Sequence, residues 1–582
     1  MSGKSKHENS KLLDADNGIN LRTHLESLRG TMRYVRASWD GQYSQLRAFF
    51  APRSGRTSTS DVNRGQRQDY EIINESGLLA LRVLCSGMQT GMSNQTRVWF
   101  KTKPSDPKLK DNQDARKWCE EVDDVVRATM LKSNFYQSLL EMYESEGLYG
   151  TGAFLIEADL KTDIRCHPYP IGSYYLGCDD TLRIDLCIRE LSMTARQIVE
   201  KFGYENVSLA ICNIYDSNAG GVKETYYPIA HVIHKGDYYG PSKTGKPNPP
   251  WMSIWYEIGQ FNEKKGILRK SGFIENPLIA GRWRTVGENI YGESPAMDVL
   301  GSVMSLQSWE ERLAQAAEKQ FNPPMIASSS IDPRRLTTLP GEFSFVDEKD
   351  VRGAFMPAYE IDFKLDGGLA MVQRIEKRID EGMFRSLFQM ISDSDRREIT
   401  AEEIRARQQE KMQILGPVVE RNVEEVLSPS YRRIVNILFR AGKLPPVPPI
   451  MQHPEGGSLP MSVEFESILA SAQKMNGLNN INAVMDFAGK EAALNQGIMD
   501  NFDVDAVARR YGDLANMPSD LMRTPEQVQK IRSDKARASQ MAELAKNAQS
   551  LAQAAQTASQ TPTSSGNLLQ AVAPGLAGGN SG

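Results

Sequence analysis

The stretch GPSKTGKP, residues 240 to 247, is the nearest match in this sequence to a motif that performs chemistry. It fits the phosphate-binding pattern G-x-x-x-x-G-K, in which backbone N–H groups and a lysine, here Lys246, hold a nucleotide. That pattern also needs a Ser or Thr after the lysine for magnesium, and a helix that begins there. Pro247 stands at the Ser or Thr position and more prolines follow, so the segment predicts a hairpin loop. A nucleotide-dependent cytosolic enzyme that uses Lys246 is the alternative, to be tested by ATP binding and its loss in Lys246→Ala.

The other candidate residues predict no catalytic or metal site. His231 and His234 have i, i+3 spacing, but HVIHKGDYY is predicted to be a strand, in which these two side chains point to opposite faces. No G-x-S-x-G motif is present, and the six cysteines show no C-x-x-C spacing, which favours buried free thiols. Three carboxylates stand at a turn and a strand start, where solvated side chains are the default: Asp179, Asp180 and Asp185. We therefore expect no catalytic residue, no metal and no cofactor.

The length of 582 residues suffices for roughly three or four domain-sized units. Hydrophobic residues make up 40%, charged residues 24%, and the mean hydropathy is -0.45, as in ordinary globular proteins. No apolar run reaches the roughly 20 residues of a membrane span, and the N-terminus lacks the apolar core of a signal peptide. We expect no membrane association and assembly in the cytosol. The net charge of -4 argues against a surface that grips nucleic acid throughout, but it allows a local basic patch.

Alternating and helical periodicities divide the first half of the chain. Period-2 alternation predicts strands in GAFLIEAD, IRCHPYPIGSYYLG and LRIDLCIREL, and again between residues 226 and 274. A helix starting near Leu21, helices over 69 to 92, 112 to 146 and 193 to 203, and a loop over 102 to 111 are also predicted.

Helices dominate after residue 290. Ser294 as N-cap and Pro295 at the first helical position predict a helix over 294 to 321, followed by an irregular or β insertion over 322 to 368 and a second helix over 369 to 391. A charged loop, SDSDRREI, then leads to a long helix over 399 to 446 that begins at a capping box at Thr400. A final Ala/Gln-rich helix is expected from Thr524 to about residue 556.

The long helix contains two prolines, each of which removes a backbone donor and should kink or restart the helix. They are Pro417, which follows Gly416, and Pro429, and Gly442 marks the predicted end. If straight, the segment would run roughly 60 Å, more than a small domain is wide. A helix of that length is typical of extended or assembled structures.

The predicted helix over 369 to 391 has two contrasting faces. Ile375, Ile379, Met383 and Leu387 form one side. The other side gathers mostly basic residues: Arg374, Lys377, Arg378, Glu381 and Arg385, with Arg396 and Arg397 in the loop beyond. A solvated helix face explains this pattern on composition alone. A stripe facing a polyanion is the functional alternative.

Five stretches, in this order, resemble the head-to-tail connector, or portal, proteins of short-tailed bacteriophages. They are LALRVLCSGMQTGMSNQTRVWF, EGLYGTGAFLIEAD, MTARQIVEKFG, IYGESPAMDVLGSVMSLQ and the stretch from TAEEIRARQQEKMQILGPVVERNVEEVL to FRAGKLPP. The resemblance implies an α+β, mostly helical portal fold that assembles as a ring, commonly dodecameric, around a channel for double-stranded DNA.

The resemblance also implies a division of the chain and a set of partners. The implied regions are a disordered tail (1–20), a wing (21–293), a stem helix (294–321), a clip (322–368), a second stem helix (369–391), a channel loop (392–399), a wing-to-crown helix (400–445), a crown (446–523) and a C-terminal helix with a disordered tail (524–582). The clip residues Arg334, Arg335, Glu342 and Asp347 would face the terminase or tail, with Gly416, Pro417 and Pro429 as hinges. Expected partners are the terminase large subunit, which hydrolyses the ATP, the major capsid and scaffolding proteins, and tail adaptors. A helical adaptor ring without DNA contact is a further alternative.

Overall fold

The computed structural model describes residues 18–53, 69–109, 112–217, 221–236, 249–259, 266–327, 355–357, 365–388, 414–451, 461–465, 481–490, 502–514, 523 and 525–560. The chain divides into two compact units. The first comprises Met1–Lys103, Cys119–Val447 and Met461–Ser471, and the second comprises Pro104–Trp118, Pro448–Pro460 and Ala472–Gly582. None of the described helices is long and apolar enough to cross a membrane.

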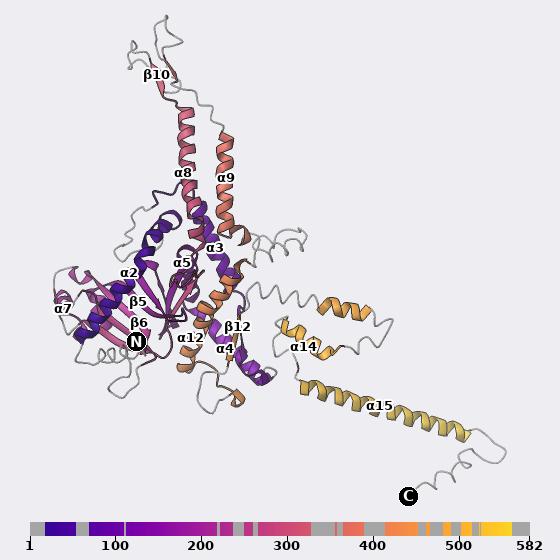
Figure 1. Ribbon diagram of the computed structural model, residues 1–582. Coiled ribbons are helices and arrows are strands. Elements are labelled where there is room, and N and C mark those ends of the chain that lie inside the picture. The colour runs from indigo at the N-terminus through magenta and orange to yellow at the C-terminus, as the bar shows by residue number, and fades with distance from the viewer. Residues whose placement is uncertain are drawn as a thin grey trace. The chain divides into compact units, whose positions relative to one another are not determined.

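The fold is mixed and mostly helical, as predicted (Figure 1). The helices before residue 290 are α2 (Gly18–Phe50), α3 (Ser76–Met92), α4 (Gln113–Lys132), α5 (Phe135–Tyr149), α6 (Ala195–Phe202) and α7 (Leu209–Asp216). The single helix predicted over 112 to 146 is wrong, because α4 and α5 are separate. Between them, the Asn134 amide donates to the Cys166 carbonyl oxygen (2.8 Å) and accepts from the Cys166 backbone N–H (2.9 Å). This tertiary pairing ends one helix and starts the next.

Two antiparallel sheets follow, where alternation predicted strands. One has the order β3 (Asp163–Tyr169), β2 (Thr151–Asp159) and β9 (Leu278–Arg282). The other is a meander of β4 (Tyr174–Cys178), β5 (Ile184–Thr194), β6 (Tyr226–Lys235), β7 (Trp251–Glu257) and β8 (Ile267–Phe273). Leu21 and Leu25 of α2 pack with Val232 on one face of this meander. On its other face α6 and α7 pack with Ile229 and Trp255, so the sheet is covered on both sides.

The predicted loop over 102 to 111 is wrong at its start. Strand β1 (Phe100–Pro104) pairs with β12 (Met461–Phe465), and Lys103 Nζ lies 2.6 Å from Glu464 Oε2. The sequence FKTKP did not predict a strand, because it contains two lysines and a proline, which are unfavourable in a central strand. An edge strand tolerates these residues.

Helices α8 (Pro295–Phe321) and α9 (Leu365–Gly382) pack side by side and extend away from the sheets of the first unit (Figure 1). Beyond their ends, β10 (Met325–Ala327) pairs antiparallel with β11 (Phe355–Pro357), the described part of the predicted insertion. The predicted second helix over 369 to 391 starts later than the helix in the structure and is interrupted by a turn at 383–384, after which 385–388 are helical; 389–391 lie outside the described residues. α9 begins earlier and ends at Gly382, because Phe384 takes a left-handed φ of 56°.

Helical structure runs from residue 414 to residue 440, within the predicted long helix. A π-helical turn spans Val423–Leu427, and α12 (Ser428–Arg440) starts directly after it with Pro429 in its first turn. Pro429 lacks an N–H group, and a widened turn tolerates that loss. The predicted end is confirmed. Gly442 has a φ of 66°, its N–H donates to the Phe439 carbonyl oxygen, and the Lys443 N–H donates to the Leu438 carbonyl oxygen. Thr400 lies outside the described residues.

In the second unit, α14 (Val504–Leu514) and α15 (Pro525–Gln560) are joined by Arg532, whose guanidinium lies 2.6 Å from Asp505 Oδ2. α15 confirms the predicted C-terminal helix, although Thr524 itself is outside the described residues.

Candidate functional site

The base of α8 is fixed by its N-cap. Ser294 Oγ accepts from the Met297 backbone N–H (3.1 Å) and donates to the Leu148 carbonyl oxygen at the end of α5 (2.8 Å). Pro295 occupies the first turn, where no intrahelical donor is needed. The predicted cap is therefore confirmed, and it also anchors α8 to the preceding helix.

The two faces of α9 and of the turn and short helical segment after it, up to Phe388, match the periodicity of the sequence. Ile375, Ile379, Met383 and Leu387 are buried, each with 3% or less of its surface exposed. Arg374, Lys377, Arg378 and Glu381 are exposed. Arg385 lies apart from them, because it is only 24% exposed and its Nη1 pairs with Asp380 Oδ1 at 3.0 Å.

The exposed face of α9 carries both paired and unpaired cations. Lys377 and Glu381 form a loose i, i+4 pair at 4.0 Å, which contributes little in water. Arg374 and Arg378, one turn apart, have no carboxylate within 4.0 Å among the described residues. α9 nevertheless has four acidic and three basic residues, so it presents two free guanidinium groups on a helix that is not basic overall.

A polar clamp that sequence reasoning missed joins the chain before α3 to both α8 and α9. The Ile73 and Asn74 backbone N–H groups donate to Gln307 Oε1 of α8 (2.7 and 2.8 Å), and Gln307 Nε2 donates back to the Asn74 carbonyl oxygen (2.9 Å). The Asn74 amide also donates to Glu310 of α8 (2.9 Å) and Glu376 of α9 (3.1 Å). The clamp fixes the chain before α3, whose start at Ser76 is also marked locally, because the Ser76 N–H donates to Asn74 Oδ1 (2.8 Å).

Several predicted site residues lie outside the described residues. They are Lys246 with its loop, the clip residues Arg334, Arg335, Glu342 and Asp347, and Arg396 and Arg397. Gly416, Pro417 and Pro429 are described and lie in helical backbone.

A buried cluster of charged groups holds the π-helical turn against β9. Arg282 Nη2 lies 2.6 Å from Glu425 Oε1, and the Arg282 backbone N–H donates to Glu425 Oε2 at 3.0 Å. Glu146 of α5 lies beside this pair with no exposed surface. A Cβ atom at Gly281 would overlap Glu146 Oε1 and Val426, so the glycine permits this close approach.

Glu146 should make stability depend on pH. Burial raises its pKa to about 8, and the neighbouring Glu425 adds to the effect. Between the unfolded value near 4.5 and this folded value, the folded protein holds a proton that the unfolded chain releases, so the free energy of unfolding falls as pH rises. We expect Glu146→Gln to remove this dependence, so that the variant gains stability over the wild type between pH 6 and pH 8 by about 2 kcal/mol. Urea unfolding at the two pH values tests this; parallel pH profiles for both proteins would contradict it.

The two histidines lie on a strand, as predicted, but Asp185 is partly buried rather than solvated, and burial raises its pKa. His231 and His234 are both buried in β6 with different partners: His231 Nε2 lies 2.9 Å from Ser253 Oγ, and His234 Nδ1 lies 2.7 Å from the Lys235 carbonyl oxygen. Asp179 accepts from Thr181 and Arg183 within its turn, which lowers its pKa below the usual range. Among the described residues, no three His, Cys, Asp or Glu side chains gather as a metal site.

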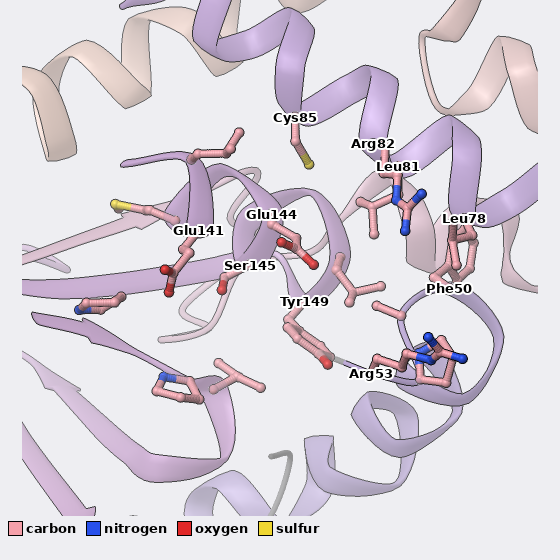
Figure 2. Close-up of a pocket in the computed structure, with 18 of the residues that line it drawn as sticks. Phe50, Arg53, Leu78, Leu81, Arg82, Cys85, Glu141, Glu144, Ser145 and Tyr149 are labelled. Carbon is pink, nitrogen blue, oxygen red and sulfur yellow. The ribbon is translucent and has the colours of Figure 1, made fainter. Parts of the chain in front are cut away.

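A cavity of about 890 Å³ lies between α3, α5 and the end of α2. Figure 2 shows Arg82 and Cys85 of α3 facing it together with Glu141, Glu144 and Ser145 of α5. Burial raises the pKa of the Cys85 thiol far above neutral, so Cys85 is not a thiolate nucleophile. Burial also raises the pKa of both Glu141 and Glu144.

Comparison with known proteins gives one consistent result. A family model described as bacteriophage head to tail connecting protein matches residues 22–522. The chain is 35% identical over 543 residues to the portal protein of Salmonella phage epsilon15, covering 93% of this chain and 96% of that protein. It is 31% identical over 557 residues to the probable portal protein of Bordetella phage BPP-1, covering 96% and 99%.

Proposed function

Because this chain belongs to the bacteriophage head-to-tail connecting protein family, and functions as a phage portal at the capsid vertex of the virion, we propose that α8 and α9 line a channel for double-stranded DNA. The observation that carries the proposal is a pair of exposed guanidinium groups on α9, Arg374 and Arg378, with no carboxylate within 4.0 Å among the described residues. They stand on the face opposite the buried stripe, where a cylindrical polyanion could pass.

The balance of charge on these helices suits a conduit. Each neutralised phosphate releases counterions and adds affinity, so a strongly basic wall would retain DNA. α8 carries four acidic and two basic residues, and α9 four and three. A few cations repeated by the symmetry of a ring would guide DNA without holding it.

The regions follow from this assignment. We assign the sheets and helices up to residue 293 to the wing, α8 and α9 to the stem, and the β10–β11 insertion to the clip. The segment over 392–399 is assigned to the channel loop. Residues 446–523 are assigned to the crown, and the residues beyond them to a C-terminal extension. The helical segment that includes α12 would connect wing to crown, with Gly416, Pro417 and Pro429 at its bends.

The proposed partners are other copies of this chain in a ring, commonly dodecameric in portals, the capsid and scaffolding proteins, the terminase large subunit and the tail adaptors. The clip residues Arg334, Arg335, Glu342 and Asp347 are proposed to contact the terminase or tail. The protein itself would be a structural connector without catalytic activity, since the terminase would supply ATP hydrolysis.

Charge reversal on α9 tests the DNA channel. We expect Arg374→Glu/Arg378→Glu to lower the yield of DNA-filled particles several-fold, because the added carboxylates repel the phosphate backbone. The assay supplies the variant to an infection that lacks a functional portal and measures DNA per purified particle. Arg396→Glu/Arg397→Glu in the proposed channel loop should impair packaging or retention in the same assay.

The control is Arg432→Glu, an exposed arginine on α12 outside the proposed channel. Negative-stain images and native mass spectrometry of each purified variant should show the wild-type ring. Rings of normal mass with normal DNA content in both α9 and loop variants would contradict the channel and favour an adaptor without DNA contact.

A further inference from the structure

A second cavity, of about 540 Å³, lies between the two sheets of the first unit. Its walls come from β2 and β3 of the three-stranded sheet, from β5, β6 and β7 of the meander, and from α6. It is separate from α8 and α9, and nothing proposed above for the channel uses it.

Two cations line this cavity, and both face aromatic rings. The Arg189 guanidinium carbon lies 4.0 Å from the centroid of the Tyr169 ring, and Lys201 Nζ lies 4.1 Å from that of Trp255. Neither has a carboxylate within 4.0 Å among the described residues. Cation–π contacts stabilise a positive charge but leave its N–H groups able to donate elsewhere.

The carboxylates that line the cavity are already engaged. Glu157 Oε2 lies 3.5 Å from His167 Nε2 across the β2–β3 pair. Glu200 Oε2 lies 3.4 Å from Arg196 Nη1, one turn away on α6. Arg189 and Lys201 are therefore the groups in the wall that can donate to an anion, and the charge of Glu157 acts on Lys201 without a direct contact.

Buried polar atoms in the cavity wall lack partners. His231 is 1% exposed, its ring stacks on Trp255 at 3.9 Å, and its Nδ1 has no hydrogen-bond partner among the described residues. Arg189 Nε and the Tyr169 hydroxyl, which is 2% exposed, also make no hydrogen bond of standard geometry among the described residues, although the Arg189 side chain lies against Tyr169. An unpaired buried polar group costs free energy, and three around one cavity indicate a site shaped for a polar ligand.

The electrostatics favour an anion. Burial, together with the charges of Arg189 and Lys201, holds the pKa of His231 well below its usual value. The His231 ring is therefore neutral and carries one N–H group. When Nε2 accepts a hydrogen bond from the Ser253 hydroxyl, the proton is on Nδ1, and Nδ1–H can donate to a ligand. The positive field that opposes protonation of His231 stabilises a bound negative group.

We propose that this cavity binds a small oxyanion of the phosphate or carboxylate class, held by Arg189, Lys201 and the His231 Nδ1–H group. Charge-assisted hydrogen bonds to the two cations would supply most of the affinity, and the Tyr169 hydroxyl would donate a further bond. The ligand would bridge the two sheets, because Tyr169 belongs to β3 and the other three residues to the meander and α6.

Calorimetric titration of the full-length protein with inorganic phosphate, and separately with succinate, tests the site. At pH 7 and low ionic strength we expect saturable binding of at least one probe, with a dissociation constant on the order of 1 mM or tighter. Lys201→Gln and Arg189→Gln should each weaken it roughly tenfold, the value of one charge-assisted hydrogen bond.

The matched control is Lys223→Gln, which removes another lysine in a cation–π contact, 5.1 Å from Tyr215 and outside the cavity. It should bind as the wild type does. Phosphate binding alone would identify a phosphate site, and succinate binding alone a carboxylate site. No binding of either probe below roughly 20 mM, a concentration at which a millimolar site would be nearly saturated, would overturn the proposal. So would wild-type affinity in Lys201→Gln, whose exposed side chain can change without unfolding the protein.

Discussion

Gly150→Ala is expected to lower the free energy of unfolding by about 3 kcal/mol or more, or to leave the protein insoluble. Gly150 ends α5 with a φ of 76°, a left-handed conformation that alanine adopts only with strain. An added Cβ atom would overlap the carbonyl group of Gly292, which is backbone and cannot rotate away. Either penalty alone would destabilise the native state.

The contact between Gly150 and Gly292 also positions α8. The Gly150 carbonyl oxygen accepts from the Trp283 backbone N–H (2.9 Å), and the Gly292 N–H donates to Thr151 Oγ1 (2.8 Å). Two residues later, Ser294 caps α8. Any shift that relieves the overlap must therefore move the start of a proposed stem helix.

Gly301→Ala is the matched control, since Gly301 lies on the exposed side of α8 with nothing within 4 Å of an added Cβ atom. It should keep or raise stability by roughly 0.5–1 kcal/mol, because alanine favours helix over glycine. Urea unfolding followed by tryptophan fluorescence measures both variants. Equal midpoints for the two alanine variants would show that the chain at residue 150 relaxes freely, contrary to this prediction.

The features that sequence predicted well were those set by neighbouring residues. Alternation located the strands of the meander, Ser294 and Pro295 located the start of α8, and Gly442 located the end of α12. Each depends on a pattern or cap within a few residues, where propensity and local hydrogen bonding agree.

The features that sequence missed depend on residues far apart in the chain. Asn134 breaks a helix because it pairs with Cys166, and Asn74 is held by Gln307 more than two hundred residues away. The periodicity of α9 correctly separated its buried stripe from its exposed face, but it also grouped Arg385 with the exposed residues. The ion pair between Arg385 and Asp380 follows from the turn at Phe384. A helical periodicity cannot predict such a turn.

Arg282→Met is expected to destabilise the protein by about 3–5 kcal/mol, the cost of breaking a buried ion pair from one side. The lost guanidinium contacts are those to Glu425 and to the Leu182 carbonyl oxygen (2.9 Å). The Glu425 carboxylate is then left next to the buried Glu146 without a compensating charge. Arg284→Met is the control. The distance from Arg284 to Glu293, 2.8 Å, is similar to that of the Arg282–Glu425 pair, but the Arg284 side chain is 54% exposed. That loss should stay below about 1 kcal/mol.

A double-mutant cycle separates the ion pair from the packing of the arginine side chain. In Arg282→Met/Glu425→Met neither charge remains, so we expect the double variant to recover much of the stability that Arg282→Met loses, with a coupling energy above roughly 2 kcal/mol. Additive losses in urea unfolding would contradict this, because they would mean that Arg282 stabilises the fold through packing and its bond to Leu182, independently of Glu425. A large coupling would show that the π-helical turn is held on β9 electrostatically. It would also explain how the chain tolerates Pro429, one residue beyond that turn. The backbone hydrogen bond that proline cannot make is offset by a side-chain pair that holds the widened turn in place.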